Sequence, residues 1–244
     1  MSPTRALVCV PTYNERDNVE ALVSALGEVI DTTRDGVLVI DDGSPDGTGE
    51  IADRLAAELP WLDVLHRASK QGIGKAYLAG FERALETEAQ LVLEMDCDFS
   101  HDPQDVPRLI ATCEEGGADL ALGSRWVAGG GTENWGLVRR AISRGGSLYA
   151  RIVLGVGIRD LTGGFKCFRR TVLESIDLES IDAAGYVFQI ETTYRALRKG
   201  FRVVEVPIRF VDRTAGESKM SGAIVLEAMR QVPILRWKAL RGVV

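Results

Sequence analysis

Residues 91–103 read Leu-Val-Leu-Glu-Met-Asp-Cys-Asp-Phe-Ser-His-Asp-Pro, an apolar run that ends on two aspartates one residue apart. The run over residues 91–95 predicts a buried strand, and Pro103 is expected to open a helical segment. Alternate residues of an extended chain point to the same side, so Asp96 and Asp98 are expected to aim at one place beyond the strand's carboxyl end. Open α/β sheets bind their ligands at that end.

Two carboxylates at one place repel each other unless a cation lies between them. Their hard oxygen atoms suit Mg²⁺ or Mn²⁺, which in such sites commonly carries a substrate diphosphate. Asp96 and Asp98 therefore predict a site for Mg²⁺ or Mn²⁺. A second interpretation is a pair of loop aspartates that cap the next helix, and the triplet alone leaves both interpretations open.

The rest of the first half repeats this alternation of strand and helix. Continuous apolar strands separated by amphipathic helices are typical of a mostly parallel sheet covered on both faces. The sequence thus predicts a doubly wound α/β fold whose strand-end loops gather at one edge. The expected strands are 6–10, 37–40, 64–66 and 120–123, and the expected helices include residues 19–30, 51–59, 72–86 and 109–113.

The second half is less regular, but no repeat, low-complexity segment or linker divides the chain, so one domain over residues 1–244 is expected. We expect a glycine-rich loop at 127–135, helices at 138–154, 188–199 and 223–239, a strand at 165–168, and a strand at 203–211 that Pro207 interrupts.

Charge is distributed unevenly along the chain, whose net charge is −6. Residues 1–134 carry 25 acidic and 10 basic side chains, whereas residues 135–244 carry 10 acidic and 19 basic ones. This asymmetry indicates an anionic partner for the second half, and solvated basic helices explain it equally well. The basic segments lack an aromatic-basic nucleic-acid motif, so no nucleic-acid partner is expected.

The loop at residues 11–15, Pro-Thr-Tyr-Asn-Glu, follows the first predicted strand. Tyr13 offers a flat ring to a base, and Glu15 offers an acceptor to donors of a base or ribose. The structural alternatives are packing for Tyr13 and a first-turn position for Glu15, and Asn14 is better explained as a helix cap.

The loop at residues 41–48 carries three aspartates. A carboxylate after the second strand of a nucleotide-binding fold suits a ribose or base, and Asp41, Asp42 and Asp46 are the candidates. A calcium-binding EF-hand loop is excluded because Asp53 occupies the position of its bidentate glutamate. A dinucleotide fingerprint is absent because Tyr77 stands where its third glycine belongs.

Four basic residues from position 125 onward are candidates for phosphate binding. A planar guanidinium binds phosphate through two parallel hydrogen bonds. Taken singly, each of these residues is also typical of an ordinary surface charge. They are Arg125, Arg139, Arg213 and Lys219.

Together these segments resemble family 2 glycosyltransferases of the GT-A fold, and within that family the polyprenol- and dolichol-phosphate mannose synthases. The matching segments run in order through nearly the whole chain. The first ones are shared by many family members, whereas the later ones are more specific to the lipid-phosphate branch. They are residues 10–15, 41–48, 95–101, 123–125, 137–140, 142–145, 160–165, 185–189, 210–213 and 216–219.

The resemblance implies one GT-A domain whose residues 1–124 bind the nucleotide sugar and whose residues 125–244 bind the acceptor phosphate. It implies that the guanosine of GDP-mannose is held by Pro11, Tyr13, Glu15, Asp42 and the backbone at Ile40.

The resemblance also assigns roles around the metal and the phosphates. Asp96 and Asp98 hold Mg²⁺ or Mn²⁺ on the diphosphate, Ser100 stands where some members carry a glutamine as a further metal contact, and Cys97 stands where an alanine is common. The residues expected to bracket the donor and acceptor phosphates, and with Asp98 to carry catalysis, are Arg125, Arg139, Arg213 and Lys219.

The implied reaction is transfer of mannose from GDP-mannose to a polyprenyl or dolichyl phosphate, with inversion, for later glycan assembly. The second pKa of a phosphate monoester lies near 6, so this acceptor is ionised at neutral pH and needs no general base. The alternatives are glucose transfer from UDP-glucose and a non-catalytic GT-A module that binds a nucleotide sugar.

The four cysteines are scattered without a C-x-x-C pair and no signal peptide is evident, which predicts a cytoplasmic protein. No apolar run approaches the roughly 18 residues of a membrane span, so peripheral membrane contact or a membrane-embedded partner subunit is expected. The terminal helix suits an anionic lipid interface, and packing on the domain is an equal alternative. It interleaves Val232, Ile234, Leu235, Trp237 and Leu240 with Arg230, Arg236, Lys238 and Arg241.

Overall fold

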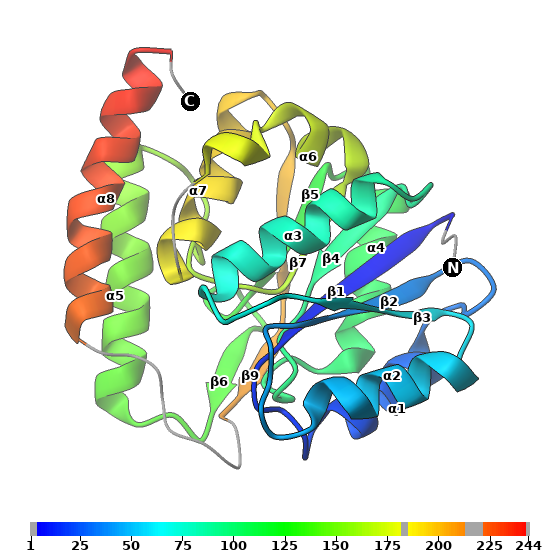
Figure 1. Ribbon diagram of the computed structural model, residues 1–244. Helices are drawn as coiled ribbons and strands as arrows, with labels where there is room; N and C mark the ends of the chain where they lie inside the picture. The colour runs from blue at the N-terminus through cyan, green and yellow to red at the C-terminus, as the bar shows by residue number, and fades with distance from the viewer. Residues whose placement is uncertain (1–3, 182–184, 213–221, 243–244) are drawn as a thin grey trace.

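The computed structural model describes residues 4–181, 185–212 and 222–242, with side chains from residue 229 onward in the last segment. A seven-stranded sheet in the order β3-β2-β1-β4-β7-β5-β8 forms its centre (Figure 1). Neighbouring strands are parallel except at β7, which runs antiparallel to β4 and β5, so the predicted mostly parallel α/β architecture is confirmed. The strands are β1 (Ala6–Thr12), β2 (Gly36–Asp41), β3 (Leu62–His66), β4 (Leu91–Glu94), β5 (Leu120–Ser124), β7 (Lys166–Arg169) and β8 (Val203–Pro207).

Helices cover both faces of this sheet (Figure 1). They are α1 (Val19–Val29), α2 (Thr48–Glu58), α3 (Ile73–Leu85), α4 (Val106–Glu114), α5 (Leu137–Leu154), α6 (Arg170–Ser175), α7 (Gly185–Arg198) and α8 (Gly222–Leu240), with 3-10 turns at Pro103–Asp105 and Leu178–Ser180. Helices α1, α2 and α4 pack on one face, and α3, α6 and part of α7 on the other.

Strands β1, β2, β4 and β5 are largely apolar because both of their faces are buried. Along β1, Val8 and Val10 join the core beneath α1, whereas Leu7 and Cys9 join the core beneath α3. This burial on both sides explains why the sheet was predictable from continuous apolar runs.

A third hydrophobic core joins α5, α7 and α8 at one end of the sheet. Helices α5 and α8 lie side by side there (Figure 1). Tyr149 of α5 donates a hydrogen bond from its hydroxyl to the carbonyl of Met229 at 2.9 Å, and Arg236 of α8 donates to the carbonyl of Leu154 at 2.9 Å.

Two local predictions were wrong, and one helix was missed. Residues 127–135 were expected to be a loop, but β6 (Gly131–Glu133) pairs in parallel with β9 (Arg209–Val211). A three-residue strand is too short to leave a periodic signal. Strand β1 was expected to end at Val10, but it continues through Pro11, which pairs with Ile40 of β2. The proline is tolerated because β4 pairs with β1 only as far as Cys9, so no N–H donor is required from Pro11. The short helix α6 was not predicted.

Candidate functional site

A pocket of about 410 Å³ opens at the carboxyl ends of β1, β2 and β4, the edge predicted for ligand binding. Nine of the predicted site residues line it: Pro11, Tyr13, Glu15, Asp42, Asp96, Cys97, Asp98, Arg125 and Arg139. Its volume lies within the range of small-molecule sites. The strand-end loops thus converge as the alternating pattern predicted.

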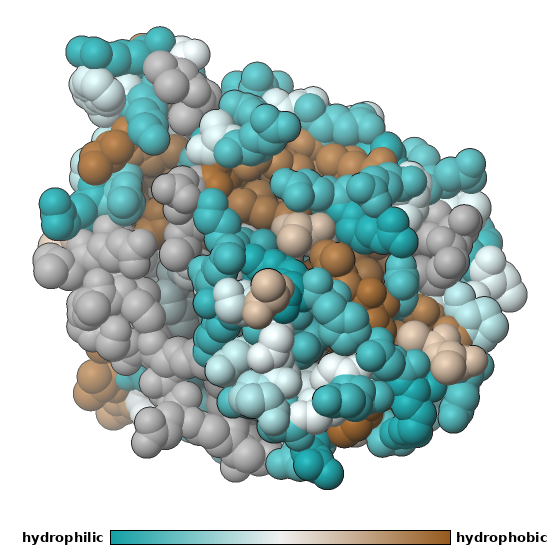
Figure 2. All heavy atoms as spheres, in the orientation of Figure 1, coloured by the Kyte–Doolittle hydropathy of each residue, from teal (hydrophilic) through white to brown (hydrophobic). Residues whose placement is uncertain are grey.

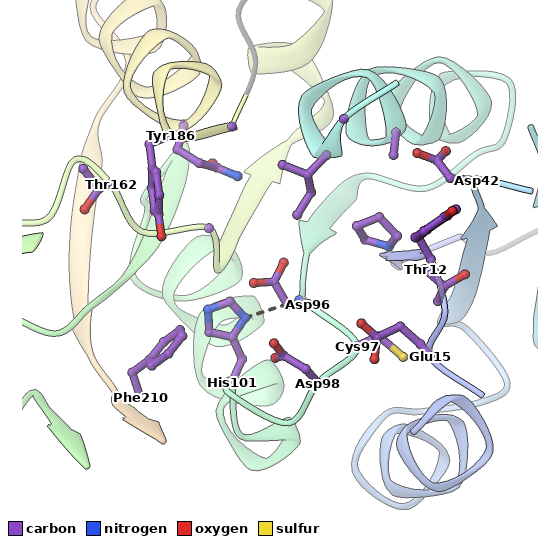
Figure 3. Close-up of a pocket in the computed structure, with 18 of the residues that line it drawn as sticks. Thr12, Glu15, Asp42, Asp96, Cys97, Asp98, His101, Thr162, Tyr186 and Phe210 are labelled. Carbon is purple, nitrogen blue, oxygen red and sulfur yellow. Dashed lines mark hydrogen bonds between the residues drawn. The ribbon is translucent and has the colours of Figure 1, made fainter. Parts of the chain in front are cut away.

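Asp96 and Asp98 point into the same cavity (Figure 3). The Tyr77 hydroxyl donates to Asp96 Oδ1 at 3.1 Å, and the Ser100 backbone N–H donates to Asp98 Oδ1 at 3.1 Å. Phe99, which lies between Asp98 and Ser100, has a φ of +57°, and this conformation turns the chain sharply after Asp98. The two carboxylates are therefore held by their own loop and by α3.

The donor set fits Mg²⁺ or Mn²⁺. Both prefer oxygen ligands, and Mg²⁺ is usually held by one or two carboxylates while substrate phosphates and water complete its shell. Asp96 and Asp98 supply two carboxylates, and no group of three or more potential metal-ligating His, Cys, Asp or Glu side chains occurs within the described residues. Such a set suits a metal shared with a substrate.

Ser100, the predicted third metal contact, is buried and is not among the residues that line the pocket. Its hydroxyl has no hydrogen-bond partner in the described part of the chain. Metal binding by Ser100 therefore stays a prediction without geometric support.

The His101 ring holds the aspartate loop in place. The Asp96 backbone N–H donates to His101 Nδ1 at 3.3 Å, and the His101 ring stacks on Phe165 with a centroid distance of 4.9 Å (Figure 3). Burial lowers the pKa of His101 to about 4, so the ring is neutral at neutral pH and Nδ1 is available as an acceptor.

The end of the pocket predicted to hold a nucleoside is formed by the first two loops. The Lys70 ammonium lies 4.0 Å from the centre of the Tyr13 ring. Asp42 pairs with Arg67, and its backbone N–H donates to the carbonyl of Thr12 at 3.0 Å. Ile40 is fully buried in β2 and does not line the pocket, so its predicted backbone contact has no support here.

The other two aspartates of the second loop hold the loop itself. Asp41 accepts the hydroxyl hydrogen bond of Ser44 at 2.5 Å, and Asp46 accepts that of Thr48 at 2.6 Å. Asn14 is not a helix cap, because α1 begins at Val19. Asn14 has a φ of +58°, and its backbone N–H donates to Ser44 Oγ at 3.1 Å.

Arg125 is buried and already bound by a carboxylate. Its Nε and Nη2 donate to the two oxygens of Asp160, each at 2.7 Å, and its backbone N–H donates to Asp160 Oδ2 at 2.9 Å. The Nε and Nη2 donors, which could otherwise bind a phosphate through two parallel hydrogen bonds, are thus already used by Asp160. A role for Arg125 in phosphate binding stays a prediction.

Arg139 is more exposed than Arg125 and is oriented differently. Its Nη1 donates to Asp212 Oδ1 at 2.5 Å, and its guanidinium lies 4.3 Å from the Trp135 ring centre. Its buried Nε has no hydrogen-bond partner among the residues described. The other two predicted phosphate ligands, Arg213 and Lys219, lie outside the described residues.

Residues 7–177 match the family model described as glycosyl transferase family 2, which is more than half of the chain. The chain belongs to this family. It is 49% identical over 229 residues to polyprenol monophosphomannose synthase of Mycolicibacterium smegmatis, with 93% of this chain and 85% of that protein covered. It is 48% identical over 243 residues to undecaprenyl-phosphate mannosyltransferase of Micrococcus luteus, with 98% of each covered.

Solved structures support the fold of this glycosyltransferase. Glucosyl-3-phosphoglycerate synthase of Mycobacterium tuberculosis, in complex with Mn²⁺, UDP-glucose and phosphoglyceric acid, superposes with a TM-score of 0.70. The two proteins are 20% identical, and the comparison covers 96% of this chain and 79% of the other. The predicted GT-A-like fold is confirmed at this level.

The glycosyltransferase pocket includes residues that the sequence did not single out. Several of them lie in the segments that carried the family resemblance, but nothing in their composition indicated a role. Lys70 had only a glycine-rich loop as a signal. The additional lining residues are Thr12, Lys70, Gly72, Ile73, Ala76, His101, Trp135, Thr162, Gly164, Gly185, Tyr186, Gln189 and Phe210.

Proposed function

We propose that this glycosyltransferase transfers mannose from GDP-mannose to a polyprenyl phosphate, with inversion at the anomeric carbon, and that it depends on Mg²⁺ or Mn²⁺. The observation that carries the proposal is the Asp96 and Asp98 pair in a pocket that also contains Arg125 and Arg139. Two mannosyl-transferring relatives of nearly the same length, each close to half identical, support the choice of substrates.

The donor would lie along the pocket from the first two loops to the aspartate pair. Tyr13, Glu15 and Asp42 line the end that suits a nucleoside. Asp96 and Asp98 would hold the metal ion, which when bound neutralises the diphosphate and makes it a better leaving group. Tyr77 and His101 keep this carboxylate loop in place through their contacts with Asp96.

The acceptor needs no proton removed. An oxygen of the ionised polyprenyl phosphate attacks the anomeric carbon, the bond from that carbon to the GDP oxygen breaks, and the electron pair leaves with GDP. Two anions meet during this step, so cationic side chains are required close to the reacting atoms. Arg125 and Arg139 line the same pocket, and the Arg139 guanidinium lies over the Trp135 ring.

The lipid tail of such an acceptor lies in a membrane. Within the described residues, no helix is both long and apolar enough to span one. The α5–α8 surface, formed by the exposed apolar side chains of these two helices, would therefore rest on the membrane. Brown patches are visible along this edge of the molecule in Figure 2. The residues are Leu137, Val138, Ile142, Leu148, Ile152, Met229, Ile234, Trp237 and Leu240.

The terminal helix was expected either to pack on the domain or to face an anionic lipid interface, and opposite sides of the helix support the two interpretations. Val232 and Leu235 are buried in the core shared with α5 and α7, whereas Trp237 and Leu240 are 52% and 68% exposed. Basic side chains beside the exposed ones suit anionic lipid headgroups. This arrangement supports peripheral contact with the cytoplasmic face of a membrane.

The decisive experiment measures transfer of labelled mannose from GDP-mannose to a short polyprenyl phosphate, with Mg²⁺ or Mn²⁺, by the wild type and by Asp98→Ala. We expect roughly a 1,000-fold loss in the variant, because it removes a carboxylate from the metal. Asp102→Ala is the control, since Asp102 is exposed outside the pocket and accepts a hydrogen bond from the Gln104 N–H.

Turnover of UDP-glucose without turnover of GDP-mannose would replace the donor in this proposal. Absence of turnover with either donor, with membranes added, would contradict enzymatic activity of the isolated chain and point to a binding module or a missing membrane-embedded partner subunit.

A further inference from the structure

A fully buried ammonium group lies beside the pocket. Lys166, the first residue of β7, donates from Nζ to the backbone carbonyl of Gln189 at 2.9 Å, to Thr192 Oγ1 at 3.0 Å, and to the side-chain oxygen of Gln189. Glu94, its cross-strand neighbour on β4, has Oε2 at 3.9 Å. An ammonium group has three N–H donors, so these three acceptors use all of its hydrogen bonds.

This contact fixes which way the Gln189 amide points. An ammonium group has no acceptor, so the amide atom that faces Lys166 has to be the oxygen, and the nitrogen points elsewhere. A Cβ placed on Gly164 would lie 3.2 Å from Gln189 Nε2, and both residues line the pocket. The amide nitrogen also interacts with the Glu94 carboxylate, and because Gly164 has no side chain, the second amide N–H remains accessible from the pocket.

Gln189 lies on the side of the pocket opposite to the nucleoside end. It is one helical turn from Tyr186 on α7. In Figure 3, Tyr186 and Thr162 lie on one side of Asp96 and Asp98, while Thr12 and Asp42 lie on the other. A donor whose diphosphate sits at the aspartate pair would place its sugar on the side of Gln189.

We propose that Gln189 donates a hydrogen bond to a hydroxyl oxygen of the transferred sugar, and that Lys166 is the positioning residue that holds the amide in this orientation. The inference rests on the proposed function, which supplies a sugar nucleotide. A neutral amide donor suits an uncharged hydroxyl, whereas guanidinium groups suit phosphates. Burying an ammonium is costly, and an apolar contact would join β7 to α7 at lower cost. The Glu94 carboxylate compensates the buried charge, and the hydrogen bond from the ammonium fixes the orientation of the amide.

The first test compares Gln189→Met with the wild type by titration with GDP-mannose and with GDP in the presence of Mn²⁺. Methionine is similar in size but donates no hydrogen bond. We expect the affinity for GDP-mannose, and kcat/KM for transfer, to fall roughly 10-fold to 100-fold, while the affinity for GDP stays within about twofold. Gln104→Met, at an exposed site outside the pocket, is the matched control. An equal loss for GDP would overturn the proposal, because it would place the contact at the diphosphate or make it structural.

The second test uses GDP-mannose analogues that each lack one sugar hydroxyl. The wild type is expected to discriminate against at least one analogue by roughly 10-fold or more, and Gln189→Met is expected to lose that discrimination, because the contact is already absent. Unchanged discrimination against every analogue would overturn the proposal. If the wild type uses UDP-glucose instead, the proposed donor fails on its own, and the same comparison with UDP-glucose and UDP tests Gln189.

The third test concerns Lys166. Removing the ammonium alone would leave Glu94 buried without its partner, so we use Lys166→Met together with Glu94→Gln. Thermal unfolding verifies that this double variant is folded. Its loss of affinity for GDP-mannose is expected to match that of Gln189→Met. When Gln189→Met is added to the double variant, we expect the affinity for GDP-mannose to fall by less than about a further twofold. Full additivity of the two losses would show that Lys166 does not act through Gln189.

Discussion

The two ends of the pocket are built differently. At the end formed by the first two loops and the aspartate pair, acidic side chains are placed by the loops that follow parallel strands. At the other end, cations are matched by carboxylates from distant segments: Arg125 by Asp160, and Arg139 by Asp212. Both carboxylates belong to residues 135–244, so the pairs leave the net charge of that segment unchanged, but they compensate the two guanidinium groups that line the pocket. Net charge along the sequence does not give the charge that a ligand meets.

The largest effect that would sharpen this comparison comes from breaking the buried pair. Asp160→Asn leaves the buried Arg125 guanidinium without its carboxylate, and we expect a loss of about 3–5 kcal/mol in the free energy of unfolding. Asp212→Asn breaks the more exposed pair with Arg139 and is expected to cost less than about 1 kcal/mol. Urea unfolding of both variants measures the difference. Equal costs would contradict the distinction between a buried and a solvent-screened pair.

A second effect, somewhat smaller, is pH-dependent and belongs to the aspartate loop. Burial lowers the pKa of His101 to about 4 in the folded chain, below its unfolded value, so the unfolded state binds more protons between about pH 6.5 and pH 4. The His101 contribution to stability is therefore complete above that window and falls by about 3 kcal/mol on acidification to pH 4.

Urea unfolding across this pH range, compared with His101→Asn, isolates the contribution. The comparison is needed because burial raises the pKa of Glu94 to about 7, so that Glu94 destabilises the fold as pH rises. A wild-type profile parallel to that of His101→Asn would show that the imidazole does not titrate in this window.

A smaller effect concerns how well the carboxylate pair is held. Tyr77→Phe removes the hydroxyl that donates to Asp96 and leaves the stacked ring in place. Because such supporting contacts orient metal ligands, we expect Mn²⁺ affinity to fall roughly 10-fold. Calorimetric titration measures it, with Tyr149→Phe, whose hydroxyl lies between α5 and α8, as the control. An unchanged affinity would mean that the aspartate loop alone fixes Asp96.

The smallest expected effect on stability lies at the surface of α8. Trp237→Ser removes an exposed side chain, and we expect the free energy of unfolding to change by less than about 0.5 kcal/mol. Sedimentation with anionic lipid vesicles is expected to show weaker binding by Trp237→Ser than by the wild type. Gln231→Ser, at an exposed polar position of the same helix, is the control. Equal vesicle binding by all three proteins would contradict a membrane role for this surface.

Much of the first half was predictable because its chemistry follows strands buried on both faces. The apolar run at residues 91–95 fixed the position of Asp96 and Asp98 without any knowledge of tertiary contacts. Composition could not tell Asp42, which lines the pocket, from Asp41 and Asp46, which hold the loop. That difference depends on side-chain direction within one short loop.

The second half was harder because its contacts join residues far apart in the chain. Arg125 and its partner Asp160 are 35 residues apart, and no local pattern links them. Gln189 accepts a hydrogen bond from Lys166, which lies in the predicted strand 165–168, and no local pattern links the two residues. Strands β6 and β9 each have three residues and form only through their mutual pairing.

Helix α7 belongs to two neighbourhoods. Its first turns supply Tyr186 and Gln189 to the pocket, and farther along Ile190 and Tyr194 join the core shared with α5 and α8. Helix α7 thus connects the α5–α8 surface to the end of the pocket that Tyr186 and Gln189 line. A molecule held on a bilayer by that surface would keep its pocket at a constant height and tilt above the lipid. It would then meet its acceptor by lateral diffusion, so turnover would follow the number of acceptor molecules per unit area of membrane instead of their bulk concentration.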